Sequence, residues 1–128
     1  MYTVVRVGST TLADDVSDAI VRMLTEFGVS SPGPGVRNPH FVNGELCTSS
    51  DWVLHRDAII AFLRRWSAAG CDHIYAELDI EFDVAVYPED RSGLLAKCLC
   101  IDNALIGELH QTHSNIMISV YNDVDENE

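Results

Sequence analysis

An alternation of apolar and polar residues over positions 74–86 is the most regular pattern in the chain. Every even position in this segment carries an apolar side chain. Four acids stand at successive odd positions, namely Glu77, Asp79, Glu81 and Asp83. Such period-two alternation predicts a β-strand with one buried and one exposed face, as in an antiparallel or mixed sheet. A register slip of one residue would bury all four carboxylates, so we expect the even positions to face the core.

Apolar residues at helical spacing predict two longer helices. Thr11 is placed to cap the first helix, and Gly28 is placed to end it. The second helix is expected to begin near His55 or Arg56 and to end before Gly70. The inner faces of the two helices carry Val16, Ile20, Met23, Leu24, Phe27, Ile59, Ile60, Phe62, Leu63 and Trp66.

Shorter apolar runs predict the remaining elements. We expect strands at residues 2–7, 52–54, 95–101 and 116–121, and a short helix capped by Asp102 or Asn103. Residues 30–48 are interpreted as a long loop, because Pro32 and Pro34 lack the backbone amides that a central strand needs. The predicted order is β-α-β-α-β-β-α-β. This is an α+β fold, with about three helices on one face of an antiparallel or mixed sheet.

Length and composition fit one domain. The chain has 128 residues, of which 47% are hydrophobic and 22% charged. We expect a single domain over residues 1–122 and a frayed acidic tail over residues 123–128. Neither a membrane span nor a signal peptide is expected, because the apolar runs are short. The cysteines, Cys47, Cys71, Cys98 and Cys100, are therefore interpreted as reduced and mostly buried thiols of a cytoplasmic protein.

The charge balance favours one class of partner. The chain has 20 acids against 8 Lys and Arg, for a net charge of −12. Nucleic acid is disfavoured as a ligand, because binding to phosphates needs clustered Lys and Arg. A cationic protein is favoured, because complementary fields speed encounter and select partners. The alternative is that the acidity only keeps the protein soluble.

The four acids at positions 77–83 would lie on one strand face, with neighbours roughly 6.5–7 Å apart. Each adjacent pair would cost roughly 0.6 kcal/mol in water, which a folded domain tolerates. Arg6, Lys97 or Arg91 on neighbouring strands could balance this charge, or a cationic partner could bind there. A face that is merely solvated is the simplest alternative. A calcium site is disfavoured, because a flat strand spreads its oxygens apart.

Other polar residues point to weaker sites. The loop over residues 30–48 carries Arg37, His40 and Phe41, which could join a contact surface. Its Gly-Pro run lacks the features of a phosphate-binding loop. Cys98, Cys100, His110 and His113 lack the spacing of a zinc site, so no metal and no cofactor is expected. If the chain were an enzyme or a small-ligand binder with a pocket between sheet and helices, its candidate residues would be His55, Asp57 and His113.

A series of landmarks follows the whole chain. The first is an acid-x-x-Ser helix start at residues 14–17, followed by a Gly-hydrophobic break before a proline at 28–32 and a glycine at 44. A Trp-hydrophobic-hydrophobic run at 52–54 and an amphipathic helix at 59–66 come next, and a closing helix with a strand ending in Tyr occupies 101–121. This order resembles a bacterial family known only as a domain of unknown function, the DUF forty-two-seventy-nine family. The resemblance implies a small intracellular protein of the sort that occurs beside secreted toxins as an immunity protein.

Charge and resemblance together lead to one functional hypothesis. We expect a cytoplasmic immunity protein, not an enzyme, that neutralises a cognate toxin by occluding its cationic surface or active site. The expected contact residues are the four acids at positions 77–83, with Arg37, His40 and Phe41. A homodimer is kept as an alternative assembly, and neither nucleic acid nor a membrane is expected as a partner.

Overall fold

A five-stranded sheet forms the centre of the computed structural model, which describes residues 1–88 and 99–121. Its order is β2-β3-β1-β4-β5. β4 and β5 run parallel, and the other neighbours are antiparallel, so the sheet is mixed. The strands are β1 (Tyr2–Gly8), β2 (Ser30–Pro34), β3 (Phe41–Thr48), β4 (Asp79–Val86) and β5 (Asn115–Val120).

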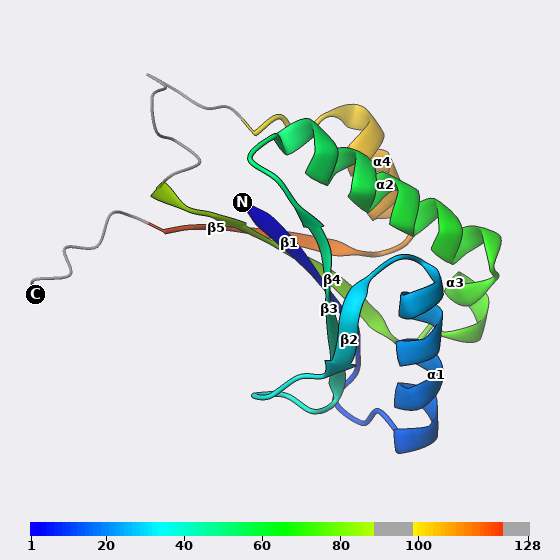
Figure 1. The fold of residues 1–128 in the computed structure, drawn as a ribbon. Coiled ribbons are helices and arrows are strands. Elements are labelled where there is room, and N and C mark those ends of the chain that lie inside the picture. Colours follow the sequence, from blue (N-terminus) through cyan, green and yellow to red (C-terminus); the bar gives the residue numbers. More distant parts are fainter. Residues whose placement is uncertain (89–98, 122–128) are drawn as a thin grey trace, which may run out of the picture.

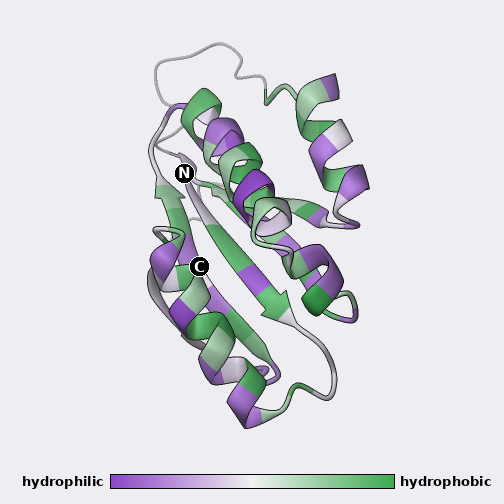
Figure 2. Cartoon of the chain, turned by 90° about the vertical axis from the view of Figure 1, so that its right-hand side faces the viewer, coloured by the Kyte–Doolittle hydropathy of each residue, from purple (hydrophilic) through white to green (hydrophobic). Residues whose placement is uncertain are grey.

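The helices of the described residues pack on one face of this sheet (Figure 1). They are α1 (Asp14–Glu26), α2 (Trp52–Ala68), α3 (Cys71–Ile74) and α4 (Asn103–Gln111). Seen from the helix side, they lie in front of the strands, with hydrophobic and hydrophilic residues interleaved along each helix (Figure 2). The predicted α+β class and one-sided packing are therefore confirmed.

The core lies between this helix layer and the sheet. The odd positions of β1 and the even positions of β4 point into it, and they include Val5, Val7, Ile80, Phe82 and Val84. The ring of Phe62 on α2 meets Phe82 edge to face, with centroids 5.7 Å apart. The opposite residues of the strands form the second face of the sheet, which carries none of the described helices and is called the open face below.

Several predicted ends of elements are confirmed. Gly28 follows α1 with a positive φ of 84°, and Gly70 follows α2 with a φ of 76°, a conformation that glycine adopts without strain. The Asp102 side chain accepts a hydrogen bond from the Leu105 amide and so caps α4. The Thr11 cap is wrong, because α1 begins after Ala13 without any side-chain cap.

The predicted loop over residues 30–48 is wrong, since it contains β2 and β3. Pro32 and Pro34 are accommodated because β2 is an edge strand, where a missing amide breaks no ladder. The pairing of β2 with β3 is also irregular between Ser30 and Gly33. The prolines exclude a central strand, as expected, but they do not exclude an edge strand.

The predicted strand at residues 52–54 is also wrong, because these residues form the first turn of α2. Asp51 is the cap: its side chain accepts a hydrogen bond from the Val53 amide at 3.0 Å. A helix N-terminus with its own capping acid thus begins earlier than the apolar pattern indicated.

The alternating segment is a strand only in its second half. β4 begins at Asp79, whereas Ile74 ends α3 and residues 75–77 form a turn. Ile74 is 69% exposed, so its predicted burial is wrong. The even positions from Ile80 to Val86 are buried, as predicted.

The predicted strand at residues 95–101 lies largely outside the described residues, as does the tail at 123–128. Residues 99–101 are described, and they are not in a strand. Ile101 instead packs against the core just before α4.

Candidate functional site

The central acids of the alternating segment are paired with a cation from β1. Arg6 lies opposite Glu81 in the β1–β4 register. Its two terminal nitrogens lie 3.1 Å from Glu81 Oε1 and 3.1 Å from Asp83 Oδ2. Asp83 also accepts a hydrogen bond from the Ser119 hydroxyl on β5. These three charged residues, called the Arg6 cluster below, are partly buried, and the guanidinium balances one of the two carboxylate charges.

The first acids of the same segment have a different environment. Glu77 lies in the turn before β4, and Asp79 is the first residue of the strand. Both side chains are exposed, and neither makes an ion pair with any residue in the ranges 1–88 and 99–121. The predicted row of four carboxylates is therefore divided into Glu81 and Asp83, which share one cation, and Glu77 and Asp79, which have none among the described residues.

The structure brings the predicted loop residues next to the Arg6 cluster. A hollow of about 570 Å³ on the open face is lined by Arg37, Phe41 and Met117 together with the Arg6 cluster. Met117 on β5 is 47% exposed there. His40 is exposed but does not line this hollow; its backbone carbonyl accepts a hydrogen bond from the Ser9 amide. Two of the three predicted loop residues thus share a surface with two of the four predicted acids.

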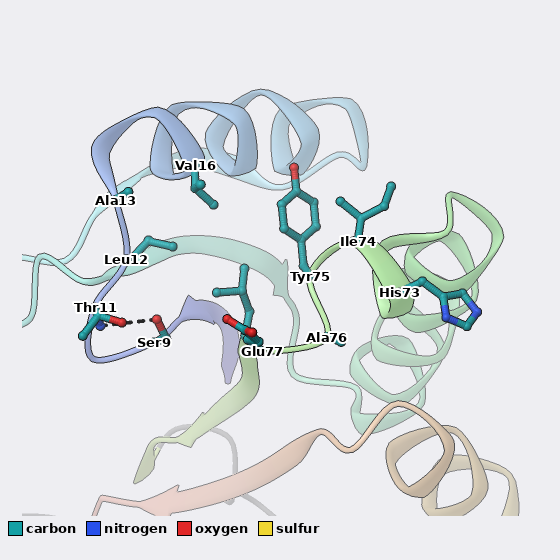
Figure 3. Close-up of a pocket in the computed structure, with 11 residues that line it drawn as sticks. Ser9, Thr11, Leu12, Ala13, Val16, His73, Ile74, Tyr75, Ala76 and Glu77 are labelled. Carbon is teal, nitrogen blue, oxygen red and sulfur yellow. Dashed lines mark hydrogen bonds between the residues drawn. The ribbon is translucent and has the colours of Figure 1, made fainter.

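A second hollow, of about 370 Å³, lies where the connection after β1 meets the connection before β4. We call it the Glu77 hollow, and its walls include Leu12, Val16, Ile74, Tyr75, Glu77 and Leu78. Figure 3 shows Leu12, Val16 and Tyr75 around one space, with Glu77 at its lower edge and His73 farther off. Apolar walls and one carboxylate together suit a ligand that is part apolar and part cationic.

The acids near the Glu77 hollow outnumber its cations. Asp14 and Asp15 follow the lining residue Ala13, and Asp72 precedes the lining residue His73. All three are exposed. Neither Lys nor Arg is among the residues that line the hollow, whereas Arg6 and Arg37 line the hollow on the open face. The negative potential of the described surface is therefore expected to be stronger at the Glu77 hollow.

A third group of acids joins two helices. Arg56 on α2 lies 2.7 Å from both Asp102 and Asp57, and Arg64 lies 2.9 Å from Glu108 on α4. Hydrogen bonds from the Leu105 amide and then from Arg56 lower the pKa of the Asp102 carboxyl. The Arg56–Asp102 and Arg64–Glu108 ion pairs link α2 to α4, whereas Asp57 pairs with its neighbour Arg56 on the same helix.

His55 is fully buried and bonded at both ring nitrogens. Nε2 lies 2.8 Å from the backbone carbonyl of Ser49, which can only accept, so Nε2 carries the proton. Nδ1 and the Thr3 hydroxyl oxygen share a hydrogen bond of 2.8 Å. His113 lies beyond α4, exposed and next to His110. The structure thus does not bring His55, Asp57 and His113 into one site.

The thiols have unlike environments. Cys71 is buried and Cys47 is half-buried, and burial raises the pKa of both thiols. Cys100 is exposed and so departs from the predicted burial of most of the thiols, and Cys98 lies outside the described residues. Within residues 1–88 and 99–121, His, Cys, Asp and Glu form no group of three or more that could hold a metal ion.

Sequence reasoning predicted Phe41 but missed Met117 in the hollow on the open face, and it missed the apolar walls of the Glu77 hollow. Met117 could have been found, because it alternates with Ile116 and Ile118 and so belongs to the open face. Leu12, Val16 and Tyr75 could not, because they meet only where α1 and the connection before β4 pack together.

Comparison with known proteins gives no relative: no family model, no curated protein and no solved structure matches the chain. Among the described residues, no helix is both long and apolar enough to cross a membrane.

Proposed function

We propose that this chain is an acidic cytoplasmic binding protein that neutralises a cationic protein. The most concrete form of this proposal is an immunity protein that occludes the cationic surface or active site of a cognate toxin. The resemblance to the DUF forty-two-seventy-nine family supports the same proposal. We further infer that the contact surface includes the end of the sheet where β1 leads into α1 and β4 begins.

One observation carries the proposal: the acids of the described surface are compensated unevenly. Arg6 forms ion pairs with both Glu81 and Asp83 and balances one of their two charges, whereas Glu77 and Asp79 have no such partner among the described residues. Charges that are satisfied internally contribute little to the field that a partner meets. Uncompensated charges attract a cationic partner and increase its rate of association.

The hollow on the open face extends this surface. Met117 and Phe41 supply apolar area next to the Arg6 cluster, and Arg37 is exposed at its rim. A surface with an apolar centre and polar rim is typical of protein interfaces. The charged end of the sheet would then increase the rate at which the partner associates, and contact with the apolar residues would slow its dissociation.

The proposal is tested by identifying the partner and its activity. The protein is used as bait in an extract of the source organism, and the captured protein is expressed in a bacterial host. We expect the captured protein to be basic, to arrest growth when expressed alone and to permit growth when co-expressed with this chain. A captured partner that is acidic, or growth arrest that persists on co-expression, would contradict the proposal.

A further inference from the structure

We propose that the Glu77 hollow receives an arginine side chain of the partner protein. This inference rests on the proposed function and names the site at which the cationic partner is anchored.

The walls of the hollow suit the carbon chain of arginine. Leu12 and Val16 lie on the side of α1, and Ile74 and Tyr75 lie on the side of the connection before β4 (Figure 3). Leu78 also lines the hollow. Ile74 is 69% exposed although it is apolar, which leaves a surface for a partner to cover. Long cationic side chains bury their aliphatic stems on such walls and keep the charged end at a polar group.

Glu77 supplies that polar group. A carboxylate can accept two parallel hydrogen bonds from a guanidinium, a geometry that a lysine ammonium does not match. Tyr75 adds a ring on which a guanidinium can pack. Its position is fixed from behind by Trp66, with ring centroids 5.9 Å apart.

Positive and negative charges both lie near the hollow, and their relative sizes decide whether the hollow attracts an anion or a cation. The N-terminus of α1 carries an effective charge of about +0.5 and would attract an anion. Glu77 lines the hollow with one full negative charge, and Asp14 and Asp15 in the first turn of α1 offset the partial positive charge of that helix end. The hollow is therefore selective for a cation.

The turn that carries Glu77 is held in place before any ligand binds. The Tyr75 amide donates to the Cys71 carbonyl at 2.8 Å, and the Leu78 amide donates to the Tyr75 carbonyl at 3.0 Å. A preformed site loses less conformational entropy on binding than a mobile one. A volume of about 370 Å³ is at the small end of ligand pockets, roughly 300–1,000 Å³. It suits one side chain better than a large ligand.

The experiment uses the full chain labelled with ¹⁵N and titrated with N-acetyl-arginine amide. We expect saturable shifts at the amides of residues 11–16 and 74–78. The variant Glu77→Gln should raise the dissociation constant at least about 3-fold, since one ion pair is lost. The matched control Glu45→Gln removes an exposed acid from β3 and should leave the constant unchanged.

Two comparisons make the result decisive. N-acetyl-citrulline amide has the same shape without the charge and should shift these amides far less, and the lysine analogue should bind more weakly than the arginine one. Equal shifts with citrulline, shifts without saturation over the whole surface, or an unchanged constant in Glu77→Gln would overturn the inference. Arginine binding without any cationic protein partner would instead refute the proposed function and leave the site standing.

Discussion

Residues 74–78 and 79–86 continue one alternating pattern, yet they differ in structure and in electrostatic surroundings. The second half is a strand because β1 pairs with it, and that pairing ends where Gly8 lies opposite Asp79. Beyond Gly8 the chain turns towards α1, so the first half has no paired strand among the described residues, and it forms a helix end and a turn. Alternation therefore predicts a strand only as far as a neighbouring strand extends.

The presence or absence of pairing with β1 also separates the four acids into two groups. Arg6 on β1 can reach both acids because Glu81 lies opposite it and Asp83 lies two register positions away on the same face of the sheet. Glu77 lies beyond the end of β1 and cannot be paired in this way. The pairing of two strands thus decides which carboxylates form ion pairs with Arg6 and which remain exposed without an ion pair among the described residues.

The largest predicted effect on stability comes from substituting apolar residues of the two segments, 74–78 and 79–86. Phe82→Ala should lower the free energy of unfolding by about 3–5 kcal/mol, because Phe82 is fully buried and leaves a cavity. Ile74→Ala should change it by no more than about 0.5 kcal/mol, because Ile74 lies at the surface. Denaturant unfolding of both variants measures the difference. Similar losses in the two variants would show that residues 74–78 belong to the core strand.

The next effect concerns the Arg6 cluster. Arg6→Leu should lower the free energy of unfolding by about 1–2 kcal/mol, since two ion pairs are lost and two neighbouring carboxylates then repel each other. Arg22→Leu is the control, because Arg22 is exposed on α1 and makes no ion pair with the described residues. Equal stability of the Arg6→Leu variant and the wild type would mean that the cluster is only a solvated surface.

The smallest effect concerns the uncompensated acids. The double variant Glu77→Gln, Asp79→Asn should be as stable as the wild type or up to about 0.5 kcal/mol more stable at low salt, because repulsion is relieved. The gain should vanish at high salt, where surface charges are screened. Thermal unfolding at two salt concentrations measures it, and a clear loss of stability at low salt would reveal an internal partner for these acids.

Sequence reasoning succeeded where local chemistry decides the structure. Gly28 and Gly70 mark helix ends through their backbone freedom, and Asp102 marks a helix start through its capping carboxylate. Arg6 was one of three cations considered as a balance for the acids. The other two, Arg91 and Lys97, lie outside the described residues.

Sequence reasoning failed where the structure of one segment depends on another segment that is distant in the sequence. Pro32 and Pro34 are compatible with a strand only because β2 falls at the edge of the sheet, and that position depends on β3. The Glu77 hollow likewise exists only because α1 packs near the turn after α3. Neither arrangement leaves a periodic signal in the sequence.

The central claim is that Glu77 and Asp79 bind the partner whereas Glu81 and Asp83 stabilise the fold. Calorimetric titration of the captured partner into two double variants tests it directly, because Glu77→Gln, Asp79→Asn and Glu81→Gln, Asp83→Asn change the net charge equally. The account predicts that the dissociation constant rises by about 30-fold or more in the first variant and by less than about 3-fold in the second. Equal effects of the two variants, or a larger effect of the second, would contradict it.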